Sequence, residues 1–100
     1  RGEKGDKGES GATQLAVRST IATVAAGANQ PPIVGCLAQE HAVGGGFISG
    51  SRDVTDFASF PSTASGAGSG GAAPGGWTVY AYNRGATAAS VSAFAVCAAP

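Results

Sequence analysis

Charged residues are scarce in this 100-residue sequence and are unevenly placed. Six Lys and Arg residues balance six Asp and Glu residues, so the formal net charge is zero. The sequence therefore lacks the basic surface that binding to nucleic-acid phosphates requires, and no nucleic-acid partner is expected. Half of the charges lie in the first nine residues, so the rest of the chain falls far below the usual charged fraction of roughly 25%. Such a body either buries much of its surface against other chains or exposes a surface with unusually few charged groups.

Methionine is absent, and histidine occurs once. Because the chain starts at Arg1 and has no methionine, we expect it to be a piece of a longer protein, and no signal peptide is evident. Nucleophilic catalysis needs a nucleophile, a base and a group that orients the base. His41 is the one candidate base, but Glu40 would point away from it on a strand, and no serine is marked out. The sequence therefore predicts no catalytic residue, no enzyme and no cofactor.

Long apolar runs are also missing. The uncharged stretches 19–39 and 57–83 are interrupted by proline, glycine or polar residues, and 85–100 is short and consists mostly of alanine and serine. A membrane-spanning helix needs about 20 predominantly apolar residues. No membrane insertion is expected.

The first twelve residues, RGEKGDKGESGA, contain a glycine at every third position. In a collagen triple helix every third residue of each chain faces the common axis, where only glycine fits. The axial residues would be Gly2, Gly5, Gly8 and Gly11. Gln14 would end this register, so the sequence predicts a collagen-like segment over residues 1–13.

Charged residues flank these glycines in the repeated order basic, glycine, acidic. In a staggered trimer a basic side chain can lie beside an acidic side chain of the next chain, although exposed pairs each contribute less than about 1 kcal/mol. The candidate interchain pairs involve Arg1, Glu3, Lys4, Asp6, Lys7 and Glu9. This proline-free segment resembles the charge-rich collagen-like stalks of bacterial and phage proteins. A disordered linker is the alternative, but a linker does not need the regular order of charges.

Four triplets without proline should not hold three chains together, so residues 14–100 are expected to supply the association. A body of this size is marginal in stability unless it is cross-linked or oligomeric. A disulfide between Cys36 and Cys97 would stabilise it by about 4 kcal/mol through loop closure. Two buried free thiols are the alternative, and a metal site that includes His41 is poorly supported by the spacing. We predict the disulfide and no metal.

Arg52, Asp53 and Asp56 form the densest group of charges in the body. Two aspartates at this spacing can bind calcium together with backbone carbonyl groups. A local pair between arginine and aspartate at a turn is the interpretation that we favour.

Short apolar or alternating runs, separated by segments rich in glycine and proline, predict strands. The predicted strands cover 33–37, 54–60, 77–82 and 89–98, with a further strand after the three glycines at 44–46. Those glycines predict a bulge or close backbone packing. Residues 15–26 fit either a strand or a short coiled-coil neck, and 62–76 has the composition of a flexible loop. The fold class is all-β, a small sandwich or barrel of five or six short strands.

The last two predicted strands have apolar residues on both faces, which favours a core on one side and a subunit interface on the other. The short turn between them predicts a hairpin. Tyr80, Tyr82 and Arg84 share one face and, with Trp77, are the candidate interface or ligand residues. Facing solvent they would recognise a sugar or receptor, facing a neighbour they would hold a trimer, and facing inward the tyrosines would be core.

The body contains three short motifs, VGGGF at 43–47, GWTV at 76–79 and AVCA at 95–98, together with Cys36 and Asn83. In these motifs the body resembles small secreted or virion-surface β-domains of actinobacteria and their phages. The resemblance implies a β-fold with paired cysteines and little established chemistry.

The sequence thus predicts a C-terminal β trimerisation domain over residues 14–100. It would form a homotrimer, set the register of three chains and nucleate the collagen-like stalk, outside the cell on a cell or virion surface. The alternative is a tip domain, displayed three at a time, whose partner is a cell-surface receptor or a glycan.

Overall fold

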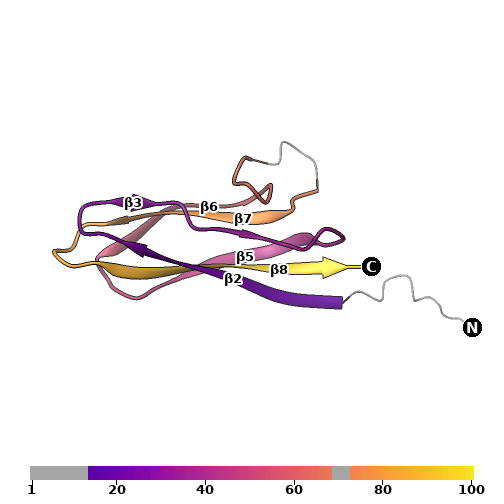
Figure 1. Ribbon diagram of the computed structural model, residues 1–100, viewed down its shortest axis with the longest axis horizontal. Coiled ribbons are helices and arrows are strands. Elements are labelled where there is room, and N and C mark those ends of the chain that lie inside the picture. Colours follow the sequence, from indigo (N-terminus) through magenta and orange to yellow (C-terminus); the bar gives the residue numbers. More distant parts are fainter. Residues whose placement is uncertain (1–13, 69–72) are drawn as a thin grey trace, which may run out of the picture.

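The structure is a computed structural model that describes residues 14–68 and 73–100. The predicted collagen-like segment, with its axial glycines and interchain charges, lies outside the described residues. The described residues form an all-β sandwich of two antiparallel sheets, and the strands run along the long axis of the molecule (Figure 1).

One sheet has three long strands in the order β2-β8-β5. They are β2 (Gln14–Val24), β8 (Ala89–Ala99) and β5 (His41–Ser49). β2 pairs with β8 without interruption from Gln14, opposite Ala99, to Val24, opposite Ala89. β5 pairs with the other side of β8 and has an irregularity between Ala42 and Gly44. The bulge predicted near the three glycines is therefore present.

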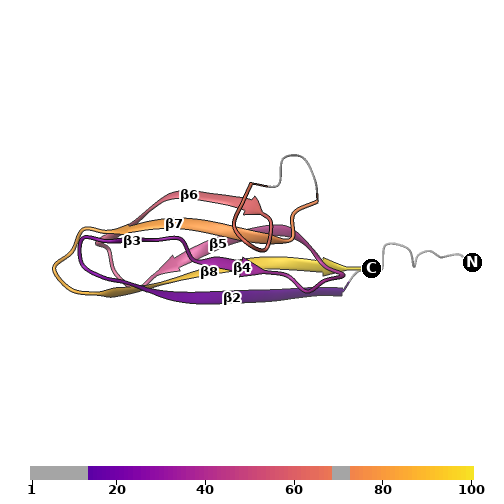
Figure 2. The same ribbon diagram turned by 45° about the horizontal axis from the view of Figure 1, so that its top comes forward.

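The second sheet is built around β7 (Gly76–Asn83). β6 (Val54–Ser62) pairs with one side of β7, and the short strands β3 (Asn29–Gln30) and β4 (Ile33–Gly35) pair with its other side. Proline has no N–H to donate to a ladder, so the two prolines at 31–32 separate β3 from β4. In Figure 2, β6 and β7 of this sheet lie above β2 and β8 of the three-stranded sheet.

Small side chains fill the space between the sheets. The fully buried apolar residues are mostly alanine and valine, contributed largely by the two central strands, and they form two neighbouring clusters. Trp77 packs against one cluster and covers Gly45, where a Cβ atom would lie 2.3 Å from the indole ring. The sheets approach closely because Gly45 has no side chain.

A disulfide joins the two sheets. Cys97 of β8 is bonded to Cys36, which directly follows β4, and the two Cα atoms are 5.8 Å apart. The predicted disulfide within one chain is therefore confirmed.

The strand predictions are largely confirmed. Of the two alternatives for residues 15–26, strand and coiled-coil neck, the structure has the strand, β2. The described residues contain seven strands and not five or six, because the segment predicted as a turn at 27–32 includes β3. β2 and β8 are also longer than the short strands expected, at 11 residues each.

The predicted hairpin between the last two strands is wrong. β7 and β8 belong to different sheets, since each already has neighbours on both sides within its own sheet. The connection is held by Asn83, whose buried side-chain amide donates to the carbonyl oxygens of Val24 and Thr87, each at 2.9 Å. Its side-chain oxygen accepts the N–H of Gly85 at 2.8 Å, so a single polar residue fixes the crossing between the sheets.

Candidate functional site

The outer surface of the three-stranded sheet carries several large and exposed aliphatic side chains. Leu15, Val17 and Ile21 project outward from β2, Ile48 projects from β5, and Val43 lies in its bulge. These five side chains are 64–70% exposed. Between them lie Phe94 and Val96 of β8, which are half-buried. We call this surface, defined by Leu15, Val17, Ile21, Val43, Ile48, Phe94 and Val96, the apolar face.

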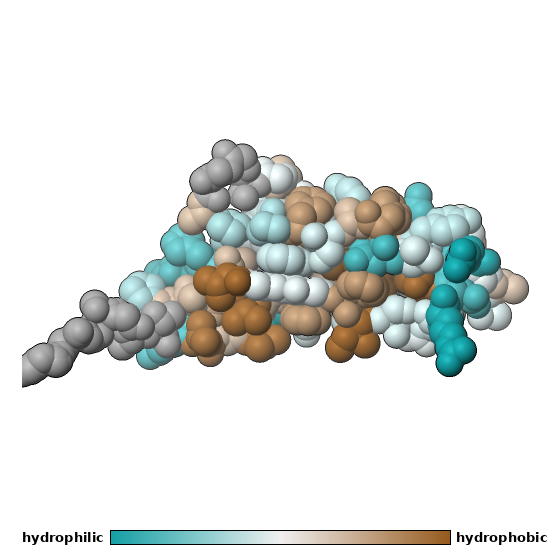
Figure 3. Space-filling view, turned by 180° about the vertical axis from the view of Figure 1, so that it is seen from behind, coloured by the Kyte–Doolittle hydropathy of each residue, from teal (hydrophilic) through white to brown (hydrophobic). Residues whose placement is uncertain are grey.

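The apolar face reverses the usual distribution of side chains in a small domain. Alanine and valine fill the core, while both isoleucines of the three-stranded sheet are exposed. No Lys, Arg, Asp or Glu projects from the described strands onto this face, because Arg18 of β2 turns inward. In Figure 3 hydrophobic side chains gather along the lower side of the molecule, where this sheet lies. An apolar surface of this kind marks an interaction site.

The start of the described chain lies at one end of the apolar face. Gln14 opens β2 opposite Ala99, at the end of β8, and Leu15 is the next residue. The predicted collagen-like segment directly precedes Gln14. The apolar face therefore begins directly after the predicted collagen-like segment in the sequence.

The outer surface of the four-stranded sheet carries a different group of side chains. Tyr80 packs against Phe57 and Phe60 of β6, with ring centroids 5.8 and 5.6 Å apart. Tyr82 lies two residues further along the same face, and each tyrosine is 37% exposed. We call Phe57, Phe60, Tyr80 and Tyr82 the aromatic cluster. Its tyrosine hydroxyls allow it to combine apolar contact with hydrogen bonding.

The structure separates the predicted interface or ligand residues. Tyr80 and Tyr82 face outward and are not core residues, and Arg84 is exposed at the end of β7. Trp77 faces the opposite way, between the sheets, and its indole N–H donates to the hydroxyl of Ser59 at 2.8 Å. Trp77 therefore belongs to the sandwich interior and does not join the aromatic cluster.

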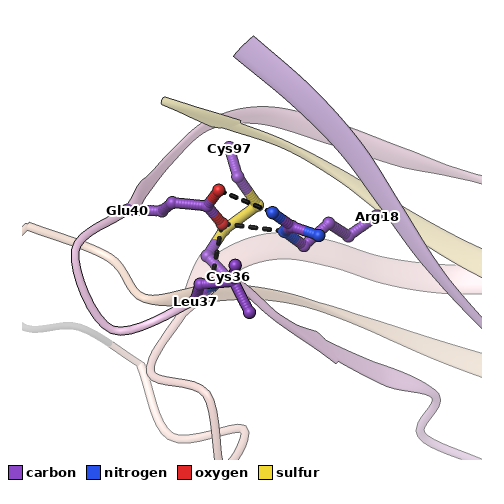
Figure 4. Close-up of polar contacts among 5 residues, drawn as sticks. All are labelled: Arg18, Cys36, Leu37, Glu40 and Cys97. Carbon is purple, nitrogen blue, oxygen red and sulfur yellow. Dashed lines mark hydrogen bonds and ion pairs between the residues drawn. A yellow bond between two sulfur atoms is a disulfide. The ribbon is translucent and has the colours of Figure 1, made fainter. Parts of the chain in front are cut away.

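An ion pair closes one end of the sandwich beside the disulfide (Figure 4). Nε and Nη2 of Arg18 donate to the two carboxylate oxygens of Glu40 at 2.8 and 2.7 Å, and the N–H of Leu37 donates to Oε1 at 2.8 Å. These hydrogen bonds, with that from Arg18 the largest cause, lower the pKa of Glu40 to about 2. The same carboxylate raises the pKa of Arg18. The pair removes the one charge of β2 from the solvent side of the sheet.

The remaining charged candidates do not converge on a site. Glu40 is engaged with Arg18, and His41 is exposed at the start of β5. Among the described residues no ion pair joins Arg52 to Asp53 or Asp56, so the predicted local pair is wrong. Asp56 instead accepts the N–H of Ala58 at 3.0 Å, across the bulge of β6.

One group of metal-ligating residue types does come together in the described part of the chain. It consists of Cys36, Cys97 and Glu40, whose ligand atoms lie within 4.8 Å of one another. The two sulfur atoms are joined to each other, so they offer no thiolate to a metal ion. This group is the disulfide and the ion pair beside it.

Comparison of the chain with protein-family models, with curated proteins and with solved structures finds no match. Residues 14–68 and 73–100 hold no helix with the length and hydrophobicity that crossing a membrane requires.

Proposed function

We propose that residues 14–100 form a trimerisation domain that associates three copies of the chain and nucleates a collagen-like stalk in residues 1–13. The observation that carries this proposal is the apolar face, whose side chains are aliphatic apart from Phe94 and on which no strand of the described residues packs. A second and third copy supply the same apolar surface, so association removes the exposed aliphatic side chains from water. The predicted triple helix requires three chains in register, which the domain would provide.

The short distance in sequence between the predicted collagen-like segment and the apolar face supports the proposed trimer. Gly11 would lie at the triple-helix axis, and Gln14 follows it by three residues. Three extended residues span at most about 10 Å. The start of β2 in each copy would therefore lie within about 10 Å of the three-fold axis. Since Leu15 and Val17 follow at once, the apolar faces of the three copies would meet near this axis.

Association through the body would make the short stalk form. Four proline-free triplets are too few to join three chains from free solution, but a trimeric body holds the chain ends at a high effective concentration. The disulfide supports a location in an oxidising compartment. We assign the domain to a cell or virion surface, where the stalk would act as a spacer and the chain would resemble the collagen-like surface proteins of bacteria and phages.

Sedimentation equilibrium of the full chain at micromolar concentration tests this function. The expected molecular mass is three times the 9.6 kDa of one chain. Replacing Gly5 and Gly8 by alanine blocks the triple helix, and these changes should leave the trimer in place because the body drives association. A monomeric wild-type chain at this concentration excludes the proposal.

The aromatic cluster supports a second function, a receptor- or glycan-binding tip displayed three at a time. Exposed tyrosines stack on the apolar faces of sugars and hydrogen-bond their hydroxyl groups. This role is compatible with trimerisation because the cluster lies on the other sheet. A glycan array probed with wild type and with Tyr80→Ala and Tyr82→Ala variants tests it. Binding that both variants lose supports the second function, and an array without any binding leaves trimerisation alone.

A further inference from the structure

The four outer edges of the two sheets differ in how well a new strand could pair with them. An exposed strand edge presents unpaired N–H and C=O groups, and natural proteins interrupt such edges with prolines, bulges or short strands. Three of the four edges in the described sandwich carry these interruptions, and one does not.

The edges of the four-stranded sheet are both interrupted. β6 contains Pro61 and an irregularity between Asp56 and Ala58, and its last residue Ser62 bridges to Gly68. On the other side, β3 and β4 are two and three residues long and are separated by prolines. Neither edge offers a long regular ladder.

In the three-stranded sheet the edge of β5 is interrupted over its first part only. The N–H of Ala42 donates to the carbonyl of Pro74 at 2.9 Å, and the bulge follows at once. From Gly44 to Ser49 the strand is regular. A Cβ atom added to Gly44 would have no neighbour within 4 Å, so the outer face of the sheet is open at this position.

β2 is the exception among the edge strands. It has 11 residues, no proline, no glycine and no bulge, and within the described ranges it pairs with β8 alone. Its one charged side chain, Arg18, is turned inward and held by Glu40. A charge that points inward from an edge strand can oppose pairing with a further strand, and here the carboxylate of Glu40 neutralises it. The edge is thus regular along its full length and unprotected.

We propose that in the trimer the free edge of β2 pairs with residues 44–49 of β5 in the next copy. This inference rests on the proposed trimerisation and names the contact that forms it. A closed three-fold assembly needs two different surfaces that meet head to tail, and pairing of β2 with β2 would give a two-fold dimer. β2 and β5 are the two edges of the same sheet, so each copy offers both surfaces. Because both strands run antiparallel to β8, the new ladder is parallel.

The radius of the resulting ring of strands agrees with the distance that the chain can span between Gly11 and Gln14. Three sheets of three strands form a closed ring of nine strands. With neighbouring strands about 4.8 Å apart and tilted by up to about 45°, such a ring has a radius of roughly 7–10 Å. That radius agrees with the reach of about 10 Å from Gly11 to Gln14. A ring slightly larger than eight strands is filled by side chains, and the apolar faces supply them.

Amide hydrogen exchange of the full-length chain tests this contact, with sedimentation measured on the same sample. In a free edge strand every second N–H of β2 points to solvent and exchanges fast. In the paired ring both sets of β2 amides, and those of β5 after Gly44, exchange slowly, with the outward set slowed on the order of 100-fold. A trimer in which every second β2 amide exchanges fast overturns the contact but leaves trimerisation standing. A monomer overturns both.

A pair of adjacent proline substitutions provides the matched variants. Neighbouring residues of a strand direct their N–H groups to opposite sides, so one of Ser19→Pro and Thr20→Pro removes a hydrogen bond to β8 and the other removes an N–H from the free edge. The variant that removes an N–H from the free edge should keep its fold, as measured by circular dichroism, and should sediment as a monomer. A folded variant that remains trimeric overturns the contact. Where both variants unfold, the exchange of the wild-type amides decides.

Discussion

The two outer surfaces of the sandwich differ in both chemistry and strand regularity. The exposed hydrophobic side chains on the surface of the three-stranded sheet are mainly aliphatic, and this surface lies on long strands of which β2 pairs without a break. The surface of the four-stranded sheet combines aromatic rings with hydroxyl groups, and it lies on strands broken by prolines, a bulge and a covering loop. Aliphatic side chains gain only by leaving water, whereas tyrosines function while partly exposed. The first surface is therefore suited to contact between copies, and the second is suited to solvent or a ligand.

The largest effect is expected when a negative charge is placed on one surface or the other, because only the surface that forms the subunit contact should then lose association. Ile21→Asp puts a carboxylate on the apolar face, beside Ser92, where a trimer would bury it without a charged partner. Such a charge costs several kcal/mol, so the association constant should fall by more than about 1,000-fold. Sedimentation equilibrium should then show monomers.

Thr55→Asp is the matched control, because Thr55 is exposed on the outer surface of the four-stranded sheet, opposite Tyr82. This variant should remain trimeric. If Thr55→Asp dissociated the trimer and Ile21→Asp did not, the subunit contact would lie on the four-stranded sheet and not on the apolar face.

Removing the disulfide should have the next largest effect, because it is the covalent link between the two sheets. The variant with Cys36→Ala and Cys97→Ala frees a loop with a sequence separation of 61 residues. In the chain-entropy model its free energy of unfolding should fall by about 4 kcal/mol. Urea denaturation at one fixed protein concentration measures the difference, since association also shifts stability. A loss below about 1 kcal/mol would mean that packing alone holds the sheets together.

Within the aromatic cluster, truncation should lower stability without changing the oligomer. Tyr80→Ala removes two ring contacts, with Phe57 and Phe60, and should reduce the free energy of unfolding by about 1–2 kcal/mol. Tyr82 is equally exposed but has no aromatic partner among the described residues, so Tyr82→Ala should cost less. Equal losses in thermal melts of the two variants would contradict the importance of the ring contacts. Dissociation of either variant would place the subunit contact on this surface.

The sequence predicts the elements of this fold better than their partners. The alternation of apolar residues predicts β6, β7 and β8 but leaves residues 15–26 open between a strand and a coiled-coil neck. The size of the body together with its two cysteines predicts the disulfide. The pairing of β7 with β8 was predicted from a short turn, but a turn does not show whether the chain stays in one sheet. Asn83 decides this through hydrogen bonds to Val24 and Thr87, and the first of these residues is distant in the sequence.

The apolar face was not predictable from alternation alone. Leu15, Val17 and Ile21 share one side of β2, and large aliphatic residues ordinarily indicate the core side. The opposite side holds Arg18, Thr20, two alanines and Val24, and the structure turns it inward, where Val24 joins the core and Arg18 bonds to Glu40. Since Glu40 lies 22 residues away, the partner that makes inward placement of an arginine favourable is visible only in three dimensions.

The smallest effect on stability is expected from the ion pair between Arg18 and Glu40, which holds the charged side chain of β2 on the inner side of the sheet. The pKa of Glu40 is lowered from 4.5 to about 2 in the folded chain, so its contribution to stability is present above about pH 4.5 and is lost as the pH falls towards 2. Glu40→Gln should therefore remove part of the pH dependence of urea denaturation in that window. Because the Arg18 side chain is 31% exposed, solvent screens the pair and the effect is modest. Its consequence for association is more specific: an Arg18 released from Glu40 returns a positive charge to the strand that borders the next copy, so acid should weaken the wild-type trimer before it unfolds the domain. A trimer that persists down to the pH of unfolding would show that the inward position of Arg18 serves the sandwich alone.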